Sequence, residues 1–98
     1  MKFKEMYDFD LLVNEAEKLI ITEMEQQFEN DTEGKICRCQ DCILDMAALA
    51  LNNIKPSYRS SFTGVVYAQQ LHDGKYMEEV KNAVKKAIDK VKKNPSHI

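Results

Sequence analysis

The sequence predicts an all-α fold, a small bundle of about four helices that carries a cysteine-rich loop. Three observations favour this class. Apolar residues recur with a 3.6-residue period near both ends of the chain, which is typical of helices that bury one face. Between them lies the stretch ILDMAALALNNI, which is apolar around almost its whole circumference. All three cysteines lie within the six positions before this stretch.

The size and composition of the chain are typical of one globular domain spanning residues 1–98, with 44% hydrophobic and 31% charged residues. No apolar run reaches the roughly 20 residues of a membrane helix, and the N-terminus lacks the apolar segment of a secretory signal. We therefore expect a cytoplasmic protein without membrane insertion. Thiols stay reduced in that compartment, and three cysteines cannot all pair within one chain, so a disulfide framework is not expected.

The first helix is predicted from Phe9 to about Asn30. Its apolar residues follow the helical period: Phe9, Leu12, Val13, Ala16, Leu19, Ile20, Met24 and Phe28. Asp8 and Asp10 are candidate N-terminal caps. The sequence NDTEG then supplies turn formers and a glycine that can take a positive φ, so the helix should end there.

The second helix is predicted to start near Gln40 and to stop at Lys55, because Pro56 disfavours helical geometry at the residue before it. Since this helix lacks a polar face, we expect it at the centre of the domain or at an interface in a homodimer. The same pattern surrounds Asp45 with apolar residues and predicts its burial.

The remaining chain is expected to contain two more helices. Residues 57–64 should form a polar connection, and residues 65–71 are ambiguous between a strand and a short helix, of which we favour the helix. After a turn at residues 72–74, the periodic apolar residues from Tyr76 to Val91 predict a final helix that ends at Asn94 and Pro95.

The cysteines have the spacing C-x-C-x-x-C, at Cys37, Cys39 and Cys42. A C-x-x-C pair at the entry to a helix can direct two sulfurs to one ion, and the C-x-C member adds a third. The positive end of the helix, Lys35 and Arg38 favour the thiolate form, and soft sulfur ligands favour Zn²⁺.

The fourth zinc ligand is not fixed by the spacing. His72 is the first candidate, and His97, Asp41, a water or a group from a second subunit are the others. Two other interpretations of the cysteines stay open: a redox C-x-x-C pair, and small residues that fill the core.

Charge is distributed unevenly along the chain. Residues 5–33 hold ten acidic residues and one lysine, whereas residues 75–93 hold seven lysines and three acidic residues. The lysines are interpreted as the solvated face of the last helix. Direct nucleic-acid binding is not expected, because such binding usually accompanies a basic domain and this chain has a pI near 5.7.

The segment CRCQDCILDMAALALNNIKPSY, together with AIDKVKKNP near the C-terminus, resembles the late competence development protein ComFB family. This resemblance implies an all-helical, zinc-binding homodimer associated with natural transformation and DNA uptake, which would act through proteins of the competence machinery. No catalytic motif is visible, so an enzyme is not expected.

The resemblance also implies a second possible role. Members of the family have been linked to cyclic dinucleotides, so this chain would be a receptor for cyclic di-GMP or cyclic di-AMP. Tyr58 would stack on a base, while Lys55 and Arg59 would contact phosphates or a guanine edge.

Overall fold

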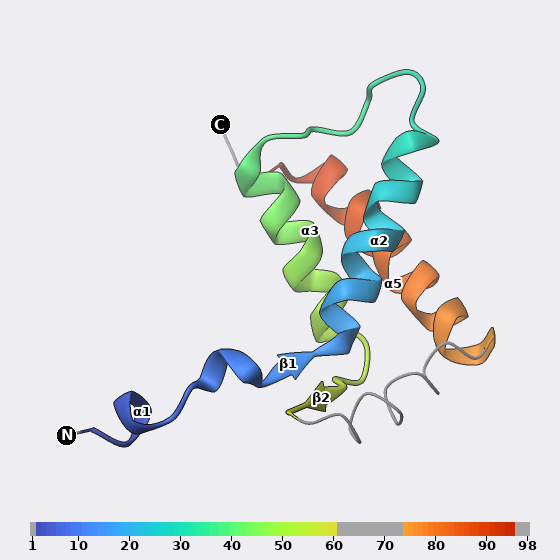
Figure 1. Cartoon of the computed structure of the whole chain (residues 1–98). Helices are drawn as coiled ribbons and strands as arrows, with labels where there is room; N and C mark the ends of the chain where they lie inside the picture. Colours follow the sequence, from blue (N-terminus) through green and yellow to red (C-terminus); the bar gives the residue numbers. More distant parts are fainter. Residues whose placement is uncertain (1, 61–73, 96–98) are drawn as a thin grey trace.

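The computed structural model describes residues 2–60 and 74–95, which form a mostly helical fold (Figure 1). Three long helices make its body: α2 (Glu15–Glu29), α3 (Gln40–Asn52) and α5 (Gly74–Lys93). The short elements are α1 (Phe3–Met6), the 3-10 turn η1 (Phe9–Leu11), β1 (Val13–Asn14) and β2 (Tyr58–Arg59). The predicted helical class is confirmed in the main, but an all-α fold is wrong in detail because β1 and β2 pair as a small antiparallel sheet. Within the described ranges, no helix combines the length and the apolar character that crossing a membrane requires.

The start of α2 differs from the prediction. The helix begins at Glu15, because residues before it pair as a strand, with Val13 opposite Arg59. The side-chain oxygen of Asn14 accepts hydrogen bonds from the backbone N–H groups of Ala16, at 3.1 Å, and Ser57, at 2.8 Å. Asn14 therefore caps the helix and ties it to the segment after α3. The expected core residues Phe9 and Leu12 are exposed, whereas the predicted helix end near Asn30 is confirmed.

The starts of α3 and α5 and the end of α5 agree with the periodicity. α3 begins at Gln40 as predicted and ends at Asn52, three residues before Lys55. The buried face of α5 contains the residues that the pattern indicated: Tyr76, Val80, Ala83, Val84, Ala87, Ile88 and Val91. The polar connection expected from residue 57 is corrected in part, since Tyr58–Arg59 is β2. The helix expected at 65–71 and most of the predicted 72–74 turn lie outside the described residues.

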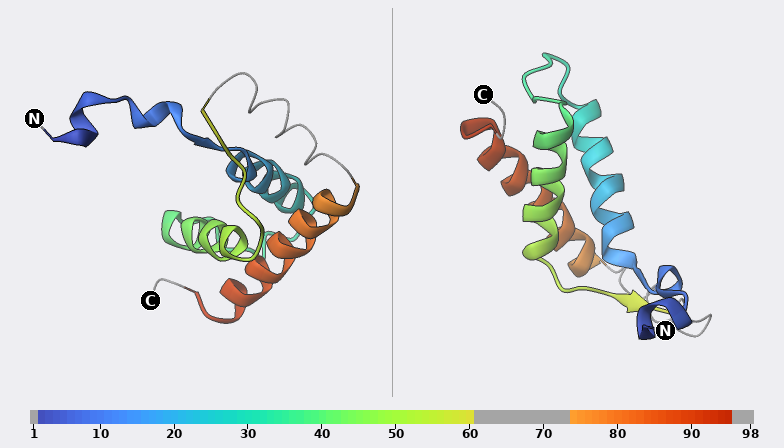
Figure 2. Two further views of the ribbon diagram at one scale, coloured as in Figure 1. Left: turned by 90° about the horizontal axis from the view of Figure 1, so that it is seen from below. Right: turned by 90° about the vertical axis from the view of Figure 1, so that its left-hand side faces the viewer.

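The core lies where α5 crosses α2 and α3 on one side (Figure 2). Ile20 from α2, Met46 from α3, and Val80 and Val84 from α5 are completely buried there. The other side of the α2 and α3 pair is not covered by α5, so part of the apolar circumference of α3 stays exposed. Asp45 lies on an exposed position of α3, and its predicted burial is wrong.

An ion pair between Glu15 and Arg59 joins α2 to β2. The hydrogen bond from Arg59 lowers the pKa of Glu15 below its ordinary 4.5, and this outweighs the opposite effect of burial. A carboxylate with a lowered pKa stabilises the fold above its unfolded-state pKa, and this contribution is lost as the pH falls.

We expect Glu15→Gln to lower the free energy of unfolding by up to about 1 kcal/mol at pH 7. The difference from the wild-type chain should shrink as the pH falls below about 4.5, because the wild-type carboxylate then becomes protonated. Urea unfolding at a series of pH values measures this, with Glu78→Gln on an exposed position of α5 as the control. A Glu15→Gln difference that persists unchanged at pH 3 would contradict the assignment.

Candidate metal centre

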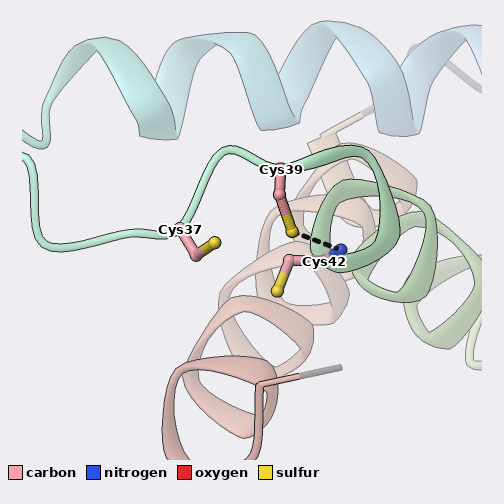
Figure 3. A group of neighbouring side chains, drawn as sticks. All are labelled: Cys37, Cys39 and Cys42. Atoms are coloured by element: carbon pink, nitrogen blue, oxygen red, sulfur yellow. Dashed lines mark hydrogen bonds between the residues drawn. The ribbon is translucent and has the colours of Figure 1, made fainter. Parts of the chain in front are cut away.

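The three cysteines meet at the N-terminal end of α3 (Figure 3). Cys37 lies in the loop from α2, Cys39 caps the helix, and Cys42 is in its first turn. Their Sγ atoms all lie within 4.8 Å of one another. Two thiolates bound about 2.3 Å from zinc at a tetrahedral angle lie about 3.8 Å apart. The sulfurs would need to approach by about 1 Å at most, so the residues fit one tetrahedral ion.

The helix start brings two of these sulfurs together. Cys39 has extended backbone geometry, and its Sγ accepts a hydrogen bond from the backbone N–H of Cys42 at 3.4 Å, drawn in Figure 3. Its carbonyl accepts the N–H of Ile43 at 3.0 Å, which begins the helical hydrogen bonding. Cys42 is buried and the other two cysteines are partly buried. The positive end of the α3 dipole therefore lies beside the sulfur atoms.

The loop before Cys37 is held by Asp31. Its carboxylate accepts hydrogen bonds from the backbone N–H groups of Ile36, at 2.9 Å, and Lys35, at 3.3 Å. The bond from Ile36 lowers the pKa of Asp31 below its ordinary 3.8. Gly34 takes the positive φ expected of it, 66°, and Ile36 is buried in the core. These interactions fix the backbone immediately before the first cysteine.

Arg38, between two of the cysteines, turns back to the last part of α2. Its Nη2 donates to the carbonyl of Phe28 at 3.0 Å, and its guanidinium lies 5.0 Å from the centre of the Phe28 ring. Lys35 forms an ion pair with Glu33 at 2.7 Å. The sequence indicated only positive charge near the thiols. The structure adds that Arg38 fastens the cysteine loop to α2, a role that the spacing alone does not reveal.

If the three cysteines take up added zinc, we expect Asp31→Ala to weaken that binding about tenfold, because the loop that positions Cys37 loses two hydrogen bonds. Competition with a chromophoric chelator measures the zinc affinity. Glu33→Ala is the matched control in the same loop, since its carboxylate pairs with the exposed side chain of Lys35. Equal affinities for Asp31→Ala and Glu33→Ala would show that Asp31 does not organise the site.

Within the described residues, none of the other predicted metal ligands joins the three cysteines. Asp41 is exposed in the first turn of α3 and is not part of the group formed by the three cysteines. His72 and His97 lie outside the described residues. The described part of the chain therefore brings together three sulfur atoms that could hold a metal ion.

The predicted ligand-binding residues lie at and before β2. Tyr58 presents its ring to solvent and is 64% exposed. Lys55 is exposed, and its carbonyl accepts the hydroxyl of Tyr76 at 2.8 Å. The side chain of Arg59 is only 21% exposed and is bound to Glu15. Tyr58 and Lys55 are therefore accessible, whereas the guanidinium of Arg59 already has an anionic partner.

Comparisons with known proteins agree with this architecture. Residues 13–95 match the model of the late competence development protein ComFB family. The solved structure of the late competence protein ComFB from Bacillus subtilis is similar, with a TM-score of 0.72 and 26% sequence identity. That similarity covers 89% of this chain and 94% of the Bacillus subtilis chain. The curated proteins include no significant match.

Proposed function

This chain belongs to the late competence development protein ComFB family, and on that premise we propose that it is a zinc-binding, non-enzymatic, homodimeric accessory protein of late competence. The observation that carries the proposal is the group of three Sγ atoms within 4.8 Å at the start of α3. Sulfur ligands favour Zn²⁺ over harder cations, and a site closed by four ligands serves structure and not catalysis.

Cys37, Cys39 and Cys42 would hold the zinc, with His72 as the proposed fourth ligand. Zinc would supply a crosslink between the loop and the first turn of α3, in addition to the hydrogen bonds made by Asp31 and Arg38. The incomplete cover of α3 supports a homodimer, since an exposed apolar helix face in a small domain is stabilised by a second subunit. The protein would then act on the competence machinery through protein contacts.

Metal content and molecular mass test this proposal. We expect elemental analysis of the purified chain to give about one zinc per chain, and light scattering at micromolar concentration to give the mass of a dimer. A metal-free preparation that is fully folded would contradict the zinc site. A monomeric mass would contradict the homodimer.

Cyclic dinucleotide binding is the second candidate function, favoured by two exposed residues close in the sequence, the aromatic Tyr58 and the cationic Lys55. Titration calorimetry with cyclic di-GMP and cyclic di-AMP tests it. We expect binding heat that is lost in Tyr58→Ala and kept in Asn82→Ala, which shortens an exposed side chain of α5. An absence of heat with both nucleotides removes this candidate.

A further inference from the structure

Residues 2–12 form an arm that extends away from the three long helices (Figures 1 and 2). Six large apolar side chains of the arm are exposed: Phe3, Met6, Tyr7, Phe9, Leu11 and Leu12. The ring centres of Phe3 and Tyr7 are 4.9 Å apart, and those of Phe3 and Phe9 are 6.3 Å apart. The arm therefore presents a cluster of aromatic rings to solvent, which is unusual unless the cluster contacts another surface.

An apolar groove of about 900 Å³ lies between α2 and α3. Its apolar lining includes Ile21, Met24 and Phe28 from α2 and Ile43, Leu44 and Leu51 from α3. In the described chain, nine large apolar side chains are exposed. Six belong to the arm, and Ile21 and Leu44 belong to the groove, so nearly all of this exposed apolar surface lies in these two features.

Charge complementarity is confined to the start of the arm, because the rest of the arm carries Glu5, Asp8 and Asp10. Glu17, Glu25 and Glu29 of α2 border the groove. The start of the arm carries Lys2 and Lys4 on either side of Phe3. With the aromatic cluster in the groove, these lysines would meet an acidic border, and such complementarity fixes the orientation of a docked segment.

The arm extends away from the three long helices (Figures 1 and 2), and none of its residues 2–12 lines the groove of its own chain. The pairing of β1 with β2 and the two hydrogen bonds to Asn14 fix the chain just after the arm. The radius of gyration is 15.6 Å, above the about 13 Å of a compact domain of this length, as expected if the arm is extended. The structure thus presents the arm outward and leaves the groove uncovered by α5.

We propose that the arm of each chain docks in the groove between α2 and α3 of a second copy, so that two reciprocal contacts close a symmetric dimer. Each chain would contribute the eleven residues 2–12 and the twelve that line the groove, which together match the roughly 20–30 residues per side of a stable interface. This inference rests on the proposed homodimer and deepens it by specifying the interface.

Complementation between two variants tests the inference. The arm variant carries Phe3→Glu and Phe9→Glu, and the groove variant carries Leu44→Glu. All three positions are exposed within one chain, so both variants should fold, which circular dichroism checks. Each variant alone should dimerise at least about 30-fold more weakly than wild type by sedimentation. A mixture should regain dimers, because the intact arm of the groove variant fits the intact groove of the arm variant.

The control is Thr22→Glu, which places a charge on an exposed position of α2 outside the groove lining and should leave the dimer unchanged. Dimers that persist in both variants would overturn the inference and leave the homodimer itself standing. An arm variant that dimerises normally would also overturn the inference, because the arm would then not be needed for the dimer. A mixture that forms no dimers would overturn it as well, because an intact arm and an intact groove would then not bind each other. A monomeric wild-type chain would refute the homodimer first.

Discussion

Cys39→Ser is expected to abolish the proposed zinc binding and to lower the free energy of unfolding by at least about 3 kcal/mol, a fall of at least about 12 °C in Tm. Serine keeps nearly the shape of the side chain but not its thiolate. Cys39 both caps α3 and contributes one of the three grouped sulfurs, so its loss affects the helix start as well as the proposed metal site. Elemental analysis and thermal unfolding by circular dichroism measure the two effects.

A chelator distinguishes the effect of losing the metal from the effect of losing the helix cap. Excess EDTA should lower the Tm of the wild-type chain toward that of Cys39→Ser and should leave the variant unchanged, because the variant has no metal to lose. If EDTA leaves the wild-type Tm in place while Cys39→Ser still melts early, the thiols stabilise the fold by packing and not by ligation.

Ile20→Ala should destabilise the fold by about 2–5 kcal/mol. Ile20 is completely buried where α2 meets the rest of the core, so its truncation removes apolar contacts and leaves a cavity. Urea unfolding with a fixed m-value measures the loss. A change of this size is a large share of the stability of a small domain.

Ile21→Ala is the matched control, since it removes the same atoms from the same helix at a position that is 46% exposed. Because Ile21 lines the groove, both variants are compared at a protein concentration at which sedimentation shows monomers. The loss for Ile21→Ala should then be about 1 kcal/mol or less, since much of its side chain is already in water. Equal losses for the two variants would mean that burial in the core is not what makes Ile20 important.

The sequence predicted those parts of the fold that depend on a repeating pattern. α5 follows its apolar period to within a few residues because one face packs on α2 and α3 while the other is rich in lysine. The start of α2 could not be read from periodicity, since Phe9 and Leu12 continue the period. It depends on the hydrogen bond that the backbone N–H of Ser57 donates to the side chain of Asn14, which is distant in sequence. The sheet was not predicted, because strands of two residues are too short to show an alternating pattern.

The grouping of the three cysteines was predictable from the sequence, whereas the residues that support their loop were not. The C-x-C-x-x-C spacing predicted that the three cysteines lie close together, because a loop followed by a helix start brings such positions together. Asp31 and Arg38 were not predictable as supports, since they act through backbone groups of Ile36 and Phe28 whose positions depend on the loop conformation. Asp45 shows the opposite error, because apolar neighbours in sequence were read as neighbours in space.

Arg38 belongs to both of the proposed binding sites. It lies in the cysteine loop and also lines the groove against Phe28, so the two proposed binding events share a side chain. Thermodynamic linkage makes such a relation mutual: if zinc favours self-association by some factor, self-association favours zinc by the same factor. Dilution should then cause the protein to release metal at a constant free zinc level. The abundance of the protein, and not zinc supply alone, would set how many chains are loaded.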